Sequence, residues 1–228
     1  ILSPPTHSAF STPRELMQFV RLLREKSGGK PIGIKLCVGR KYEFISLCKA
    51  MIAENTYLDF ITVDGGEGGT GAAPPEFSDH VGMPLRDALA FVHDTLKGFD
   101  LKKEIKIIAS GKIISGFDIV RALSIGADVC NSARGMMFAL GCIQALECNR
   151  NTCPTGIATQ DPNLYNGLDV NLKSHRVSRY HHETVKNALE LIAASGLSHP
   201  DEVNRWVVCR RIDANNIETF RETYPELT

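Results

Sequence analysis

Three cysteines fall close together in the second half of the chain, at Cys142, Cys148 and Cys153, and the last is followed directly by proline. Soft thiolate ligands at short spacing suit iron–sulfur clusters or zinc. Three thiolates are too few for an ordinary four-thiolate cluster or a closed zinc site, but they are enough for a 3Fe–4S cluster, which lacks one iron. Free cysteine also packs as a small buried hydrophobe. Spacing alone therefore leaves cluster ligands and inert thiols as equal alternatives.

A single charge, Lys35, stands in an otherwise apolar segment over residues 31–38. Burying an unpaired charge is costly, so a buried ammonium group should meet an anion or a polar ligand. The alternative is a lysine whose long side chain carries its charge from the end of a strand to water. The sequence does not separate the two.

Glycine is concentrated after the next apolar segment, with five glycines between Gly65 and Gly71. Such a run lets the backbone close on a ligand. It lacks the spacing of the dinucleotide fingerprint and of the P-loop, so a mobile loop is the alternative. Asp64 and Glu67 could act as acid or base here, although solvated loop carboxylates are commoner. The histidines are scattered, and we expect them to be solvated or to cap helices.

Two further turns, Ser110-Gly111-Lys112 and Ala133-Arg134-Gly135, each follow a predicted strand and open onto a predicted helix. Exposed backbone N–H groups at a helix N-terminus bind phosphate. Eight-stranded (β/α)8 barrels often bind phosphate in the loops after strands seven and eight. Ordinary strand–helix turns also favour glycine, so a phosphate site is a hypothesis at this point.

Hydrophobic periodicity predicts the elements that would position these residues. The first helix begins with a capping box, Thr12-Pro13-Arg14-Glu15, and is stopped by Gly28-Gly29. Further helices are predicted over 42–54, 84–96, 117–125 and 134–146, and strands over 31–38, 59–64, 105–109 and 128–133. The first strand is apolar enough to be buried on both faces. Beyond Cys153 we expect a helix over 180–194 and a shorter one from 199 to 208.

This alternation predicts an α/β fold with a parallel sheet and right-handed crossovers, either doubly wound or part of a barrel. A whole barrel needs eight repeats in ~250 residues, and about half of these are visible. In either architecture ligands bind at the C-terminal ends of the strands. Three of the features above converge there: the two glycine-containing turns, Lys35 and the glycine-rich loop.

The composition excludes several classes of protein. The chain of 228 residues has 26 basic and 26 acidic side chains, which argues against a nucleic-acid-binding or anionic-membrane surface. No apolar run is long enough to span a bilayer, and no charged-then-apolar leader opens the chain. Seven cysteines without regular loop spacing indicate a reducing, cytoplasmic compartment. The opening Ile1-Leu2-Ser3-Pro4-Pro5, without an initiator methionine, suggests a fragment of a longer protein.

Four stretches together carry a specific likeness: 33–36 (Gly-Ile-Lys-Leu), 64–74 (Asp-Gly-Gly-Glu-Gly-Gly-Thr-Gly-Ala-Ala-Pro), 109–112 (Ala-Ser-Gly-Lys) and 141–156, which holds the three cysteines. In this order they resemble the FMN-binding synthase domain of glutamate synthase. Long fused members tend to have a second glycine at position 112 and no arginine at 134. This chain is therefore more similar to the shorter, archaeal-type members.

The resemblance implies a (β/α)8 barrel, of which this chain carries the C-terminal half, strands five to eight, in residues 1–146. Residues 147–228 would form the cysteine loop and a helical C-terminal extension. The resemblance also implies the roles of individual residues. Lys35 would end strand five and face the flavin, with Glu67 as a second catalytic residue. The FMN phosphate would be held by Ser110, Gly111, Lys112, Ala133, Arg134 and Gly135. The substrate loop would contain Asp64, Gly66, Gly68, Gly69 and Thr70, and the 3Fe–4S cluster would be held by Cys142, Cys148 and Cys153.

The implied reaction is reductive synthesis of glutamate from 2-oxoglutarate and ammonia through their imine, with electrons arriving by way of the cluster. A glutaminase and an electron donor would be separate domains or subunits. A related FMN and cluster enzyme of another amino-transfer or methylamine–glutamate reaction is an alternative. So is a non-catalytic cluster-binding module or a fragment without cofactor. A half-barrel exposes two unpaired edges and an apolar face, so we expect self-association or completion by another chain.

Overall fold

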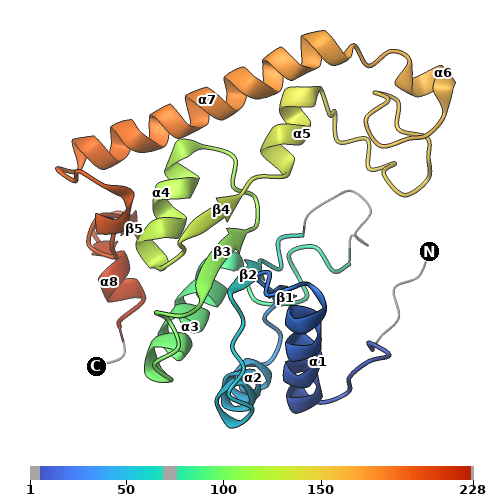
Figure 1. Ribbon diagram of the computed structural model, residues 1–228. Helices are drawn as coiled ribbons and strands as arrows, with labels where there is room; N and C mark the ends of the chain where they lie inside the picture. Colours follow the sequence, from blue (N-terminus) through green and yellow to red (C-terminus); the bar gives the residue numbers. More distant parts are fainter. Residues whose placement is uncertain (1–5, 69–75, 227–228) are drawn as a thin grey trace.

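A computed structural model describes residues 6–68 and 76–226 (Figure 1). In this part of the chain, four strands form one parallel sheet in the order β1-β2-β3-β4. Helices and strands alternate as predicted. The elements are α1 (Pro13–Lys26), β1 (Gly33–Cys37), α2 (Lys41–Ala53), β2 (Phe60–Asp64), α3 (Leu85–Gly98), β3 (Lys106–Ser110), α4 (Gly116–Ile125), β4 (Val129–Asn131) and α5 (Arg134–Leu140).

Local signals explain where several of these helices begin and end. The predicted capping box is present at α1, where the Thr12 hydroxyl and the Glu15 carboxylate satisfy each other's backbone N–H groups. Ser115 and Asp118 form the same arrangement at α4. That helix ends at Gly126, whose φ of +116° is a left-handed conformation that glycine adopts without strain.

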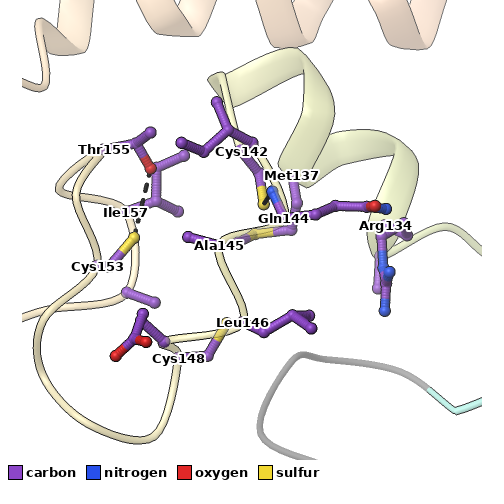
Figure 2. A pocket seen from close by; sticks show the side chains of 14 residues that line it. Arg134, Met137, Cys142, Gln144, Ala145, Leu146, Cys148, Cys153, Thr155 and Ile157 are labelled. Carbon is purple, nitrogen blue, oxygen red and sulfur yellow. Dashed lines mark hydrogen bonds between the residues drawn. The ribbon is translucent and has the colours of Figure 1, made fainter. Parts of the chain in front are cut away.

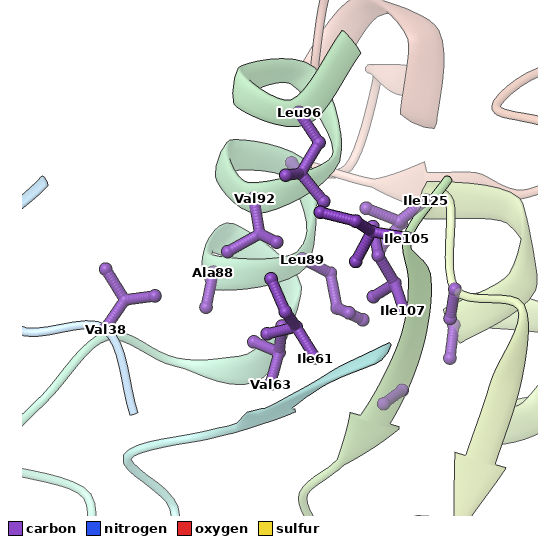
Figure 3. Close-up of a cluster of buried hydrophobic side chains, with 14 of the residues drawn as sticks. Val38, Ile61, Val63, Ala88, Leu89, Val92, Leu96, Ile105, Ile107 and Ile125 are labelled. Atoms are coloured by element: carbon purple, nitrogen blue, oxygen red, sulfur yellow. The ribbon is translucent and has the colours of Figure 1, made fainter. Parts of the chain in front are cut away.

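Strand order and side-chain burial decide between the two predicted architectures. Sequential strands joined by right-handed crossovers place every crossover helix on the same face of the sheet. On that face Ile61, Val63 and Ile107 are buried against α3 (Figure 3). The sheet therefore has a covered outer face and an uncovered inner face, as a segment of a barrel does and a doubly wound sheet does not.

Register defines the rows of side chains on the inner face. Residues paired between neighbouring strands point to the same side, so Lys35, Thr62, Ile108 and Val129 form one row. The next row, nearer the C-terminal ends of the strands, contains Cys37, Asp64, Ser110 and Asn131. Several members of both rows are exposed, and Val129 is 51% exposed. The expectation that the first strand is buried on both faces is wrong, because Lys35 and Cys37 on its inner side are exposed.

The C-terminal extension packs back onto the strand–helix units. It contains α6 (Pro162–Tyr165), α7 (Val170–Ala194), a 3-10 turn (Pro200–Glu202), β5 (Cys209–Arg211), β6 (Ile217–Thr219) and α8 (Phe220–Thr223). Helix α7 lies across α4 and α5 (Figure 1). Ala188, Ile192, Val203, Val208 and Phe220 of the extension belong to the same buried cluster as the sheet.

Three predicted helix boundaries are wrong. Helix α5 ends at Leu140 instead of residue 146, because Gly141 turns left-handed at φ +108°. Helix α7 begins at residue 170 instead of 180, capped by the Asp169 carboxylate, which accepts from Leu172 N at 3.0 Å. The helix predicted from 199 is only the turn at Pro200–Glu202.

Candidate functional site

Three predicted site residues meet at the C-terminal ends of β1, β2 and β3. Lys35 Nζ lies 3.0 Å from Asp64 Oδ2, and Ser110 Oγ donates to Asp64 Oδ1 at 2.7 Å. Lys35 is the third of five residues in β1, not its last. Its side chain is 60% exposed, which agrees with the second of the two alternatives, a lysine that carries its charge to water. It nevertheless has the anionic partner that an ammonium group in an apolar strand requires.

Glu67 lies over the same ends of the strands and is held there by a helix. Its carboxylate accepts from the Leu85 backbone N–H at 2.9 Å (Oε1) and 3.2 Å (Oε2), at the first residue of α3. A negative charge at a helix N-terminus is favourable. A Cβ at Gly65 would overlap with this carboxylate, and one at Gly111 would lie 3.4 Å from it. Glu67 therefore caps α3, a contact that the sequence did not indicate.

The described ends of the glycine-rich loop are tied to residues 79–83. Gly66 N donates to Met83 O at 2.9 Å, and Asp79 N donates to Gly66 O at 2.8 Å. A Cβ at Gly66 would lie 2.7 Å from Gly82 O, so close backbone packing requires glycine there. Gly68 is left-handed at φ +73°. Gly69 and Thr70 lie outside the described residues.

The predicted phosphate residues occupy two different environments. Gly111 and Lys112 follow β3, and Lys112 Nζ lies 3.3 Å from Asp79 Oδ1 in an exposed ion pair. Ala133 occupies the N-cap position of α5, and Arg134 is the first residue of this helix. These two line the pocket that also contains the cysteines.

Gly135 has a packing role. A Cβ on this residue would overlap with the Tyr180 hydroxyl of α7, which itself donates to Ile114 O. Only glycine lets α7 approach α5 this closely. This role was not among those that the sequence suggested for Gly135.

The three cysteines line one cavity of about 290 Å³ beyond α5 (Figure 2). Its walls also include the apolar side chains of Met137 and Ile157. The loop that carries the cysteines is closed by Asn151, whose Oδ1 accepts from Gln160 N at 2.6 Å. Glu147 accepts from the Thr152 hydroxyl at 2.6 Å within the same loop. The sequence therefore folds this loop into a defined shape around the cavity.

Cys153 is the cysteine with the clearest chemical environment. Its Sγ lies 3.3 Å from the Thr155 hydroxyl. This hydrogen bond and the backbone N–H groups of residues 155, 157 and 158 lower the pKa of Cys153 to about 7, outweighing its partial desolvation. The thiolate, which is the form that binds metal, is thereby favoured. Thr155 was missed as a site residue, although the run Cys-Pro-Thr-Gly was a local signal for it.

The three thiols are the donor type that iron–sulfur clusters use, and they line one cavity. Within residues 6–68 and 76–226, no group of three or more His, Cys, Asp or Glu side chains is arranged to hold a metal ion. Thiolates of an iron–sulfur cluster bind separate irons and so surround a volume instead of converging on one point. The three cysteines line such a volume.

Comparison with known proteins shows the family to which most of the chain is similar. The family model described as "Conserved region in glutamate synthase" matches residues 1–198. The chain belongs to the glutamate synthase family. The glutamate synthase large subunit-like protein YerD of Bacillus subtilis is 44% identical over 216 residues, which are 94% of this chain and 41% of that protein. The archaeal glutamate synthase [NADPH] of Methanocaldococcus jannaschii is 35% identical over 198 residues, 86% of this chain and 38% of that protein.

This member of the glutamate synthase family thus spans about two fifths of the length of these relatives. Among solved structures, it is similar to the L230A mutant flavocytochrome b2 with benzoylformate. The TM-score is 0.52 at 14% identity, over 85% of this chain and 37% of that one. The likeness concerns the fold alone, and with the strand order it confirms the α/β class and the partial (β/α)8 barrel. No helix in the described ranges is both long and apolar enough to cross a membrane.

Proposed function

We propose that this chain supplies the C-terminal half of the FMN-binding barrel, and the cluster loop, of a glutamate synthase-like oxidoreductase. The observation that carries the proposal is the family match over residues 1–198. Within this range, motif residues of three strands meet at one end of the sheet. Lys35, Asp64 and Ser110 are joined there. This is the end at which parallel α/β folds bind ligands.

The residues at this end fit a flavin in their charges. Lys35 presents its ammonium group on the uncovered inner face, where a positive charge would favour the electron-rich reduced cofactor. Gly111, Lys112, Ala133, Arg134 and Gly135 would hold the phosphate, in the order expected for loops seven and eight. The exposed pair of Lys112 with Asp79 contributes little by itself, so this lysine is available for an anion. Bound FMN would supply hydride transfer.

The cysteine loop would hold a 3Fe–4S cluster through Cys142, Cys148 and Cys153. Cys153 is prepared for this by the donors that stabilise its thiolate. The apolar walls of the cavity, such as Met137 and Ile157, would exclude water from the cluster. The cluster would supply one-electron transfer.

The substrates that we propose are 2-oxoglutarate and ammonia, which give glutamate when their imine is reduced. Glu67 would position the glycine-rich loop toward the substrate by capping α3. Relatives named glutamate synthase [NADPH] suggest a nicotinamide cofactor as the source of electrons. A glutaminase and an electron donor would be supplied by other domains or subunits.

Three measurements test this proposal on the purified protein. Flavin absorbance and iron content report the two cofactors. Glutamate formation from 2-oxoglutarate and ammonium, with a chemical reductant, reports the reaction. Methylamine in place of ammonium separates a methylamine–glutamate enzyme from a glutamate synthase. Absence of protein-bound flavin would overturn the enzymatic proposal and leave the cluster-binding alternative.

The uncovered inner face also bears on the association of this chain with other chains. Strands β1 and β4 are the two edges of the described sheet, and each has an exposed residue, Cys37 in β1 and Val129 in β4. Unpaired edges and apolar faces favour association. We expect the isolated chain to self-associate or to be completed by another chain. A stable monomer in analytical ultracentrifugation would contradict this expectation.

A further inference from the structure

We propose that Asp64 is a positioning residue that holds the Lys35 ammonium group at the end of the barrel and sets the net charge it presents to bound flavin. This inference rests on the function proposed above. It adds a role for Asp64 beyond those that the sequence suggested, which were a place in the substrate loop and action as an acid or base.

The geometry gives Asp64 two partners on two neighbouring strands. One carboxylate oxygen lies 3.0 Å from Lys35 Nζ, and the other accepts from Ser110 Oγ at 2.7 Å. Lys35 stands one row deeper in the sheet than Asp64 and Ser110. Its long side chain therefore reaches toward the C-terminal ends of the strands to meet the carboxylate. Strands β1, β2 and β3 are linked through a single side chain.

The position of the Asp64 side chain is fixed by contacts that do not involve Lys35. Ser110 lies directly opposite Asp64 in the register of β2 and β3. The backbone of the next residue continues this pairing, since Gly65 N donates to Ser110 O at 2.8 Å. An exposed lysine–carboxylate pair is ordinarily weak because both side chains must be ordered. Here only the lysine remains to be ordered, so Asp64 acts as a preorganised anchor.

The neighbouring acidic groups do not compete for this role. Glu67 is engaged with the Leu85 backbone N–H of α3. Cys37 lies opposite Asp64 in the same row. Partial burial and the nearby Asp64 carboxylate raise the pKa of the Cys37 thiol, which stays uncharged at neutral pH. In the row formed by Cys37, Asp64, Ser110 and Asn131, the negative charge belongs to Asp64.

Replacement of Asp64 by asparagine tests the charge of this side chain separately from its position. Its amide oxygen can accept from Lys35 and its amide nitrogen can donate to Ser110, so Asp64→Asn removes the charge and leaves the shape. Lys35→Met removes the ammonium group instead. Asp100→Asn is the matched control, because Asp100 is an exposed carboxylate in the turn before β3, at the opposite end of the strands.

The test is the midpoint potential of protein-bound FMN in the flavin-loaded enzyme, measured by spectroelectrochemistry. We expect Asp64→Asn to shift the potential upward, because the ammonium charge is no longer neutralised, and Lys35→Met to shift it downward. In the Lys35→Met background, Asp64→Asn should give a smaller upward shift than in the wild-type background, because only the field of the carboxylate is lost there and no ammonium group remains for Asp64 to hold. Asp100→Asn should leave the potential and the thermal unfolding midpoint unchanged.

Two results would overturn the inference. Equal shifts from Asp64→Asn with and without Lys35 would mean that Asp64 acts by its own field. Unchanged potential in Asp64→Asn would mean that it has no influence on the flavin. Either result leaves the proposed function standing if the wild-type protein binds FMN. Failure of the wild-type protein to bind FMN would overturn both.

Discussion

The attachment of the C-terminal extension to the sheet depends on a buried ion pair, and its removal gives the sharpest stability prediction. Arg205 is 3% exposed. Its Nη2 donates to Asp94 Oδ1 at 2.6 Å and its Nη1 to Asp94 Oδ2 at 3.2 Å. Nη1 also donates to Tyr224 O at 2.6 Å. This guanidinium group therefore joins α3 to both ends of the segment that contains β5, β6 and α8.

Arg205→Met would remove the guanidinium partner of the Asp94 carboxylate, which is only 13% exposed and would keep His93 Nδ1 at 2.8 Å. Breaking a buried pair by removing one partner costs about 3–5 kcal/mol. For a chain of this size each kcal/mol lowers the melting temperature by roughly 2–4 °C, so we expect a decrease of about 10 °C. The double variant Arg205→Met/Asp94→Leu should recover much of this loss, because apolar replacement of a whole buried pair is often neutral.

Urea unfolding measures the effect, followed by far-UV circular dichroism and by the fluorescence of Trp206. This is the single tryptophan of the chain, and Arg221 of α8 lies over its ring at 4.6 Å. The control is Lys97→Met, which breaks the exposed Lys97–Glu226 pair of 2.8 Å and should cost less than about 1 kcal/mol. A loss in Arg205→Met no larger than in this control would refute the reasoning.

Three further predictions address the cluster, the helix packing and acid stability. Cys148→Ser should abolish iron–sulfur absorbance and leave the far-UV spectrum intact; full retention of iron would reject the ligand assignment. Gly135→Ala should lower the melting temperature because the new methyl group overlaps with the Tyr180 hydroxyl. The double variant Gly135→Ala/Tyr180→Phe should restore part of the loss. An unchanged melting temperature in Gly135→Ala would reject this packing role. Burial alone would raise the pKa of Asp128, but bonds from Ile107 N and Lys102 lower it overall. Its stabilisation is therefore complete above the unfolded-state pKa of about 3.9 and disappears as the pH falls below it. Acid titration of stability should show a smaller loss in Asp128→Asn, and an equal loss would contradict this.

Local sequence patterns predicted the alternation of strands and helices because periodicity and capping act over a few residues. The box formed by Thr12 and Glu15 is complete within one helical turn. The same locality explains the errors. Residues 170–179 of α7 carry many polar side chains exposed to water, so their hydrophobic pattern was weak. Gly141 ended α5 by a backbone conformation that a periodic apolar run does not reveal.

Contacts between distant segments were beyond prediction from pattern alone. Arg205 and Asp94 are more than one hundred residues apart, and neither residue type indicates burial. Glu67 was placed among the catalytic candidates, and its bond to Leu85 N depends on how α3 returns to the sheet. The grouping of Cys142, Cys148 and Cys153 around one cavity agrees with their spacing. The donors to Cys153 are mainly backbone groups, which residue identity does not specify.

The exposed Lys35 lies where the packed interior of the barrel borders the ligand site. Barrel interiors are filled by layers of bulky side chains from alternate strands, yet the inner row of this sheet contains Lys35 at one edge and Val129 at the other. Any half that closes the barrel must cover Val129 and Ile108 with apolar side chains. It must also leave room at the C-terminal ends of the strands, where Asp64 holds the ammonium group. The boundary between packed core and ligand site therefore runs between two adjacent rows of the sheet, and Lys35 crosses it.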